Sequence, residues 1–142
     1  DIIWAKKNPI PESIKDRPTS SHEHIFLFSK QPKYYYDFES VREKINDPMN
    51  NGGYEFRNKR DVWSVRVASY PGAHFATFPI ELIIPCIKAG SPKGGLVLDP
   101  FMGSGTVAEA AKSYGRFYTG VELNPEYHKI IHNRTKQQEL FA

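Results

Sequence analysis

Cysteine is scarce in this sequence, which has only one, Cys86, among 142 residues. A single cysteine excludes an internal disulfide, and its apolar neighbours predict a buried thiol in a reducing compartment. Long apolar runs are absent as well, because none approaches the ~18 residues that a membrane-spanning helix needs. We therefore expect a cytoplasmic protein with no membrane partner, and a disulfide-rich secreted scaffold is excluded.

Positively charged residues outnumber negatively charged ones by only a small margin. The formal net charge is +3, the isoelectric point is about 8.9, and the basic surplus is spread over both halves of the chain. Such a mild and even surplus does not by itself predict a nucleic-acid partner. Hydrophobic residues make up 39% of the sequence, which is enough to build the core of one ordinary domain.

Strand-like alternation dominates the first half of the chain. Runs of β-branched and aromatic residues predict strands over residues 1–5, 22–30, 33–38 and 62–67. Between the last two of these strands the sequence is polar and rich in turn-forming Asn, Asp and Gly. We interpret this middle third as an insertion.

The second half changes to a helical period and then alternates strands with helices. Thr77 is placed to cap a helix with Pro79 in its first turn, and Gly90 ends that helix. The elements predicted after it are a strand over 95–98, a helix ended by Gly115, a strand over 117–123 and a helix from Pro125. This alternation favours a parallel sheet and the α/β fold class.

A glycine-rich turn joins the strand at 95–98 to the helix after it, within the stretch LVLDPFMGSGTVAEAA at 96–111. At such a turn, backbone amides and the helix dipole can face an anionic or polar ligand group. Gly103 and Gly105 permit a positive φ and close approach of a ligand, because neither has a Cβ. For an isolated Gly-x-Gly, a tight turn that binds nothing is an equally good interpretation.

An acidic residue at the end of the next strand favours a ligand. Glu122 lies about 20 residues beyond Gly103, where nucleoside-binding folds place the carboxylate that accepts the ribose hydroxyls. The alternative is that it caps the helix beginning at Pro125. A dinucleotide is disfavoured because residues 123–142 suffice for one helix but not for a second mononucleotide half, and no Lys-Ser/Thr follows the glycines to make a Walker loop.

These residues resemble those of a known family. The segment DPFMGSGT at 99–106, with ELNP at 122–125 after it and AHFATFP at 73–79 before it, is similar to the DNA methyltransferases that modify adenine N6 or cytosine N4. The order of the segments resembles the permuted group, in which the S-adenosylmethionine loop lies near the C-terminus. The stretch KDRPTSSHEHIFLFSK at 15–30 matches the region that follows the catalytic segment in that group.

The resemblance implies a Rossmann-like methyltransferase sheet with S-adenosylmethionine as cofactor. The cofactor-binding residues that it implies are Phe75, Thr77, Pro79, Asp99, Phe101, Gly103, Gly105, Thr106 and Glu122. For Phe75, packing in the core is an equally good explanation. The implied division of the chain is the end of the catalytic half at 1–38, a target-recognition insertion at 39–72 and the cofactor-binding half at 73–142.

The family's catalytic segment is missing from the sequence. In that family an Asp, Asn or Ser followed by Pro-Pro-Tyr or Pro-Pro-Phe holds the flipped base, and this chain contains no Pro-Pro. We therefore expect no catalytic residue in this chain, with the segment and its central strand lying upstream of Asp1. The chain alone is then expected to be inactive.

Basic residues in the insertion are the candidates for contact with double-stranded DNA. They are Arg57, Lys59, Arg60 and Arg66, set around Phe56 and Trp63. Such a cluster can bind phosphates or read a guanine edge, although a solvated strand face explains it as well. His128 and His132 have helical spacing but no third ligand, so no metal site is expected.

Three hypotheses remain open at this point. The first is part of a DNA amino-methyltransferase of a restriction-modification system. The second is a non-catalytic subunit that binds cofactor or DNA and completes a partner supplying the Pro-Pro-Tyr segment. The third is a DNA-binding module without a cofactor.

Overall fold

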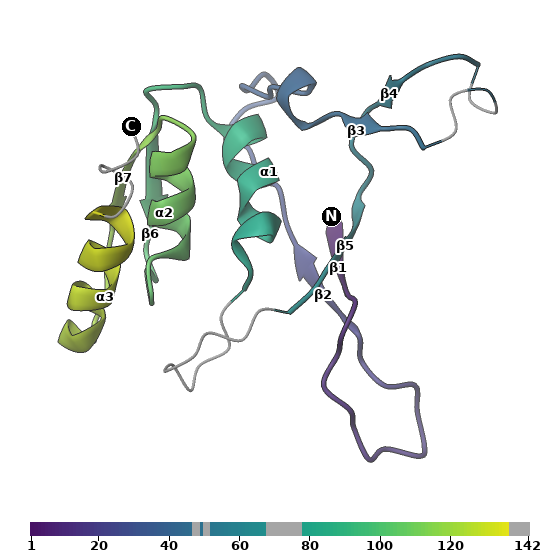
Figure 1. Cartoon of the computed structure of the whole chain (residues 1–142), viewed down its shortest axis with the longest axis horizontal. Coiled ribbons are helices and arrows are strands. Elements are labelled where there is room, and N and C mark those ends of the chain that lie inside the picture. The colour runs from purple at the N-terminus through teal and green to yellow at the C-terminus, as the bar shows by residue number, and fades with distance from the viewer. Residues whose placement is uncertain (47–48, 50–51, 68–77, 137–142) are drawn as a thin grey trace.

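The computed structural model describes residues 1–46, 49, 52–67 and 78–136. The described strands form three small sheets, with the orders β2-β1-β5, β3-β4 and β6-β7. Helix α1 (Ile80–Gly90) contacts both β5 and α2, and Figure 1 shows it between the first sheet and the α/β unit that holds β6 and β7. None of the described helices is long and apolar enough to cross a membrane.

Two tryptophans anchor the first sheet. Its central strand β1 (Ile2–Lys6) pairs antiparallel with β2 (His22–Ile25) and parallel with β5 (Val62–Val65). The register places Trp4 beside Trp63, and both indoles are buried with Leu82 of α1. Each indole N–H is satisfied, donating to the carbonyl of Val65 at 3.0 Å or of Arg60 at 2.6 Å.

The predicted strand over 33–38 is wrong. That segment pairs with no strand among the described residues, and it leads into a short 3-10 helix, η1 (Glu39–Val41). The backbone N–H of Asp37 instead donates to the carbonyl of Ala89 at the end of α1, at 2.9 Å. The strand predicted over 22–30 ends at Ile25, which pairs with Ile2 at the start of β1. The alternating sequence continues beyond Ile25, but β1 offers no further residue to pair with it.

The insertion contains a short hairpin. Strand β3 (Glu43–Lys44) pairs antiparallel with β4 (Phe56–Arg57), and the register places Glu43 opposite Arg57. Opposite charges facing each other across two strands stabilise such a pair modestly. The hairpin therefore carries a charged pair inside the segment predicted to be an insertion.

The predicted parallel α/β unit is confirmed. Strand β6 (Leu96–Asp99) leads through the glycine-rich turn into α2 (Thr106–Ser113), and β7 (Phe117–Gly120) lies parallel to β6 before α3 (Pro125–Lys136). The strand predicted over 117–123 ends at Gly120, so Glu122 lies in the turn that follows. Helix α1 begins at Ile80 with Pro79 at the N-cap position, whereas Thr77 lies outside the described residues.

Small side chains let α2 pack closely on its neighbours. Ala110 and Ala111 have no exposed surface and pack with Ile87 of α1. Arg116, only 7% exposed, ties the end of α1 to the start of β7. Its guanidinium donates to the carbonyls of Ser91 at 2.6 Å and Tyr114 at 2.5 Å, so a buried cation is satisfied by carbonyl oxygens.

One face of the α/β sheet is uncovered. Leu96 and Leu98 of β6 are 66% and 64% exposed, and Phe117 of β7 is 69% exposed. Within the described residues β6 pairs with β7 alone, which leaves its other edge without a strand. A parallel strand is normally covered on both faces, so this face of the sheet lacks its usual cover within the described residues.

Candidate functional site

The glycine-rich turn is built by hydrogen bonds at the carboxyl end of β6. The carboxylate of Asp99 accepts the N–H of Phe101 at 3.0 Å, and the carbonyl of Met102 accepts the N–H of Gly105 at 2.9 Å. Gly103 and Gly105 have φ values of 52° and 84°, in the left-handed region that glycine adopts at little cost. The turn thereby delivers the chain into α2.

The two glycines have different neighbours. A Cβ at Gly103 would find no atom nearer than a carbonyl oxygen 4.0 Å away, so this side of the turn is open. A Cβ at Gly105 would lie 3.1 Å from Cγ1 of Ile131 in α3. Both glycines were expected to allow close approach of a ligand, but the absent Cβ of Gly105 makes room for α3, and of the two only Gly103 faces open space.

Glu122 joins the glycine-rich turn to the turn after β7. Its carboxylate accepts the N–H of Gly103 at 2.6 Å and the N–H of Asn124 at 2.8 Å. These bonds, that from Asn124 first, lower the pKa of Glu122, so the carboxylate is ionised at neutral pH. Each of its oxygens retains a second lone pair for a further donor.

The capping role considered for Glu122 belongs to Asn124. The side-chain oxygen of Asn124 accepts the N–H of Glu126 at 3.0 Å, in the first turn of α3. This is the ordinary N-cap arrangement for an asparagine. The carboxylate of Glu122 is therefore not the N-cap of α3.

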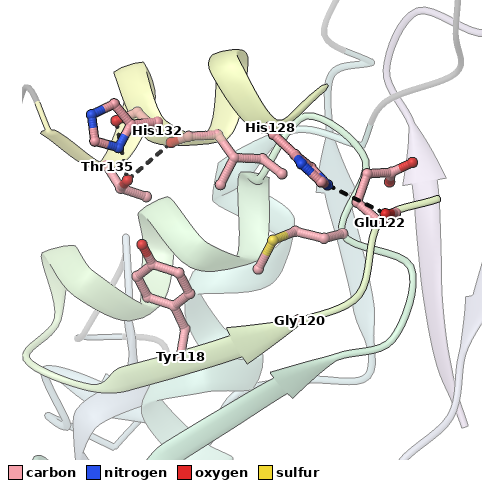
Figure 2. A pocket seen from close by; sticks show the side chains of 8 residues that line it. Tyr118, Gly120, Glu122, His128, His132 and Thr135 are labelled. Carbon is pink, nitrogen blue, oxygen red and sulfur yellow. Dashed lines mark hydrogen bonds between the residues drawn. The ribbon is translucent and has the colours of Figure 1, made fainter. Parts of the chain in front are cut away.

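The surroundings of Glu122 combine exposed apolar surface with a narrow groove. Phe101 and Leu123 are 90% and 97% exposed, whereas Met102 is buried, and its methyl group occupies the space that a Cβ of Gly120 would need. A groove of about 250 Å³ runs between β7 and α3, as Figure 2 shows, and its lining residues are Met102, Tyr118, Gly120, Glu122, His128, Ile131, His132 and Thr135.

The histidines of α3 line this groove without forming a ligand cluster. Nε2 of His128 lies 3.4 Å from the carbonyl oxygen of Glu122, and His132 lies further along the same wall in Figure 2. In the part of the chain that the structure describes, no three His, Cys, Asp or Glu side chains are grouped to hold a metal ion.

The structure brings some of the predicted cofactor residues together and not others. Asp99 and Glu122 lie at and just after the carboxyl ends of the paired strands β6 and β7, where the carbonyl of Asp99 accepts the N–H of Val121 at 3.0 Å. Thr106 is buried and turned toward α3 instead of the open side of the turn. Pro79 is buried at the start of α1, and Phe75 and Thr77 lie outside the described residues.

Sequence reasoning missed Arg134, which holds the back of the glycine-rich turn. Its Nη1 donates to the carbonyl and the hydroxyl of Ser104 at 3.0 and 2.9 Å, and its Nε donates to Glu109 at 2.7 Å. The available signal was weak, namely an acid in the first turn of α2 and a base in the last turn of α3. A single sequence does not show that Glu109 of α2 and Arg134 of α3 are in contact.

Two of the four predicted DNA-binding residues are paired within the insertion. Glu43 accepts from Arg57 at 3.2 Å and from Lys59 at 3.3 Å, and Nζ of Lys59 lies 4.8 Å from the ring centroid of Trp63. Burial raises the pKa of Glu43, but the hydrogen bonds from the two cations outweigh it and the net shift is downward. Glu43 therefore stays ionised and neutralises part of the basic cluster.

The other two basic residues are exposed. Arg60 and Arg66 have no carboxylate partner among the described residues, and Arg60 lines a groove of about 550 Å³ with the Glu43 cluster. Of the four predicted basic residues, two are therefore paired with Glu43 and two are exposed to solvent.

A glycine-rich turn after one parallel strand, with an acid after the next strand, is typical of nucleoside-binding α/β folds. Comparison with known proteins assigns the family. The family model described as DNA methylase matches residues 1–133, so this chain belongs to that family of N6- and N4-type DNA methylases. The membership predicted from the glycine-loop and HFATFP motifs is confirmed.

Individual relatives agree with the family. The chain is 53% identical over 139 residues to the type II methyltransferase M.Cfr9I of Citrobacter freundii, covering 98% of this chain and 44% of that protein. The solved structure of PvuII DNA methyltransferase (cytosine-N4-specific) matches with a TM-score of 0.75 at 21% identity, covering 94% of this chain and 49% of that one. A crystal structure of an M1.HpyAVI-SAM complex matches with a TM-score of 0.61 at 26% identity, covering 94% and 58%.

These matches confirm the predicted α/β methyltransferase fold. They also show that the chain spans under half the length of its curated relative M.Cfr9I. The expected division at residues 38 and 72 and the individual site residues stay predictions.

Proposed function

We propose that this chain supplies the S-adenosylmethionine-binding part of a DNA methyltransferase that acts on the exocyclic amino group of adenine or cytosine in double-stranded DNA. The observation that carries the proposal is the ionised carboxylate of Glu122, fixed by two backbone amides beside the open side of Gly103. When bound, S-adenosylmethionine supplies an electrophilic methyl group. The proposed place of action is the cytoplasm.

The donor set fits this cofactor. A ribose diol presents two O–H donors, and Glu122 offers two acceptor oxygens whose orientation is already fixed. Asp99, at the neighbouring strand end, brings a second carboxylate near a turn that would receive a cationic amino acid. The exposed side chains of Phe101 and Leu123 offer apolar surface to the rest of the nucleoside.

The other predicted cofactor residues differ in what supports their proposed roles. Gly105 and Thr106 shape the turn from the α3 side, as their contacts with Ile131 and Arg134 indicate. Phe75 and Thr77 keep their proposed place over the methionine end on the strength of the resemblance alone. A solved relative with SAM bound, at 26% identity, supports the same cofactor for this chain.

The insertion is proposed to contact DNA through Arg60 and Arg66, with Arg57 and Lys59 held in place by Glu43. Exposed arginines suit phosphate contact, and each contact releases counterions from the DNA. An arginine supported by a carboxylate is more rigid and is better suited to reading a guanine edge.

Replacing Arg60 and Arg66 with glutamine should reduce the salt dependence of DNA binding. Each lost phosphate contact is expected to reduce the slope of log K against log salt by about one. The measurement is a fluorescence-anisotropy titration of the complete protein encoded by this reading frame, at several salt concentrations. Lys93→Gln, in the exposed turn before β6, is the control for the loss of one positive charge outside the insertion. Equal slopes for the paired substitutions and the control would remove the insertion from the DNA interface.

The proposed function itself is tested by methyl transfer from tritiated S-adenosylmethionine to mixed-sequence duplex DNA. The complete protein should incorporate label, whereas the 142-residue chain alone should not. The reason is that a flipped amino group must be held against the methyl carbon, and such positioning contributes roughly 7–11 kcal/mol to catalysis. Label incorporated by the chain alone would place catalytic residues within this sequence.

A second candidate function is a non-catalytic subunit that completes a separate partner. The exposed leucines of β6 and its free edge favour a chain completed by other strands, whether these come from the same polypeptide or from another. Reading the genomic sequence ahead of Asp1 separates the two. A continuous frame encoding the Pro-Pro-Tyr segment supports one polypeptide, and a start codon at this boundary supports a subunit.

A further inference from the structure

The last turn of α3 reaches the glycine-rich turn through one side chain. Arg134 donates from Nη1 to the carbonyl of Ser104 at 3.0 Å, to its hydroxyl at 2.9 Å and to Oγ1 of Thr106 at 3.3 Å. Its side chain is largely buried, and Nη2 and Nε both contact Glu109 in the first turn of α2. A single guanidinium therefore joins the turn, α2 and α3.

The residue that Arg134 grips lies between the two flexible positions of the turn. Ser104 is flanked by Gly103 and Gly105, both with positive φ, and its own surface is buried. Two glycines give the backbone many alternative conformations, and fixing one of them costs conformational entropy. The bond from Arg134 to the carbonyl of Ser104 favours one orientation of the peptide that joins Ser104 to Gly105.

The turn is held from two opposite sides. Glu122, after β7, binds the N–H of Gly103, and Arg134 of α3 binds Ser104, beside the point where Ile131 packs against Gly105. If the Arg134 contacts were lost, the peptide that joins Ser104 to Gly105 would be held only at its N–H, by the carbonyl of Met102 at 2.9 Å, and its carbonyl could tilt. The N–H of Gly103 would then meet Glu122 less often, and the carboxylate would lose part of its fixed orientation.

We propose that Arg134 is a positioning residue for the cofactor turn, acting through Ser104 and Thr106 with Glu109 as its counter-charge. The inference rests on the proposed function, because the ligand whose binding it tunes is S-adenosylmethionine. Arginine is required at this position because its planar fork serves a carboxylate and a carbonyl together. A lysine ammonium cannot reproduce that geometry.

The test compares Arg134→Gln and Arg134→Lys in the complete protein with a matched control, Arg116→Gln. Arg116 is also a buried arginine bonded to carbonyl oxygens of the same α/β unit, but it joins the end of α1 to the start of β7. Calorimetry measures the Kd for S-adenosylmethionine, steady-state methyl transfer separates KM from kcat, and thermal unfolding without ligand reports stability.

Arg134→Gln should raise the Kd and KM for S-adenosylmethionine by about tenfold and leave kcat within about twofold of wild type. Arg134→Lys should recover only part of the affinity. Arg116→Gln should lower the unfolding midpoint while the Kd stays within about twofold. If Arg134→Gln does not fold, Ser104→Ala and Glu109→Gln remove single partners of the same network and should each raise the Kd several-fold.

An Arg134→Gln protein with wild-type Kd and KM would overturn the inference. So would an equal rise in Kd for Arg116→Gln, which would mean that general loosening of the unit explains the effect. Failure of the wild-type protein to bind S-adenosylmethionine would instead contradict the proposed function, so the two failures are distinguishable.

Discussion

Replacing Glu122 with alanine should weaken binding of S-adenosylmethionine to the complete protein by tenfold or more, the largest effect of any substitution outside the glycines. The ribose hydroxyls of the cofactor would lose a charged acceptor, and hydrogen bonds to a charged group are about twice as strong as neutral ones. The N–H groups of Gly103 and Asn124 would lose their acceptor at the same time. Isothermal titration calorimetry is the measurement.

Glu126→Ala is the control for this prediction, since Glu126 is an exposed acid in the first turn of α3. It should leave the affinity unchanged. Wild-type affinity in the Glu122→Ala protein would remove Glu122 from the site.

The affinity should also depend on pH in a defined direction. The backbone N–H bonds lower the pKa of Glu122 from its ordinary value of 4.5. Because its pKa is lowered, Glu122 of the folded, ligand-free protein stays ionised at and above that ordinary value, and it loses its charge only as the pH falls through the lowered pKa. The Glu122 contribution to affinity is therefore expected to stay level from neutral pH to about pH 5 and to fall only below it.

Replacing Gly105 with alanine should destabilise the protein by about 2–3 kcal/mol. A left-handed conformation costs a non-glycine residue about 1–2 kcal/mol, and overpacking against a neighbouring helix adds to this. The new methyl group would lie 3.1 Å from Cγ1 of Ile131 and 3.4 Å from its Cα, so Ile131 must give way by a few tenths of an ångström. Urea unfolding of the complete protein measures the loss.

Gly103→Ala is the matched comparison, because its φ of 52° is strained for alanine but its Cβ would point into open space. It should cost about 1 kcal/mol in stability, since only the backbone strain applies. The same open space is where the cofactor is proposed to bind, so Gly103→Ala should show the greater loss of affinity relative to its loss of stability. Equal destabilisation by the two substitutions would contradict the packing role of Gly105.

The α/β unit was predictable because its elements follow from local patterns. Helical periodicity with a helix-ending glycine predicted α2, Pro125 predicted the start of α3, and the order of elements predicted the parallel pairing of β6 with β7. The position of Glu122 at a strand end followed from the same order. These features depend on neighbours a few residues apart, which one sequence contains.

Other features depend on partners far along the chain. Alternation over 33–38 indicates two faces but does not supply a strand to pair with, and the N–H of Asp37 bonds to α1 instead. The same limit applies to charges. Arg57 and Lys59 were predicted to contact DNA, but in the structure both bond to Glu43. Nothing in the sequence marked Arg134 as a partner of the glycine-rich turn.

The location of the tryptophans decides what spectroscopy can observe in this molecule. Both tryptophans of the sequence, Trp4 and Trp63, lie buried in the first sheet, and the α/β unit with the glycine-rich turn contains none. Intrinsic fluorescence therefore reports on the first sheet and does not sense the turn directly. Helix α1 packs against both parts, so it is a route by which a ligand at the turn would change the emission.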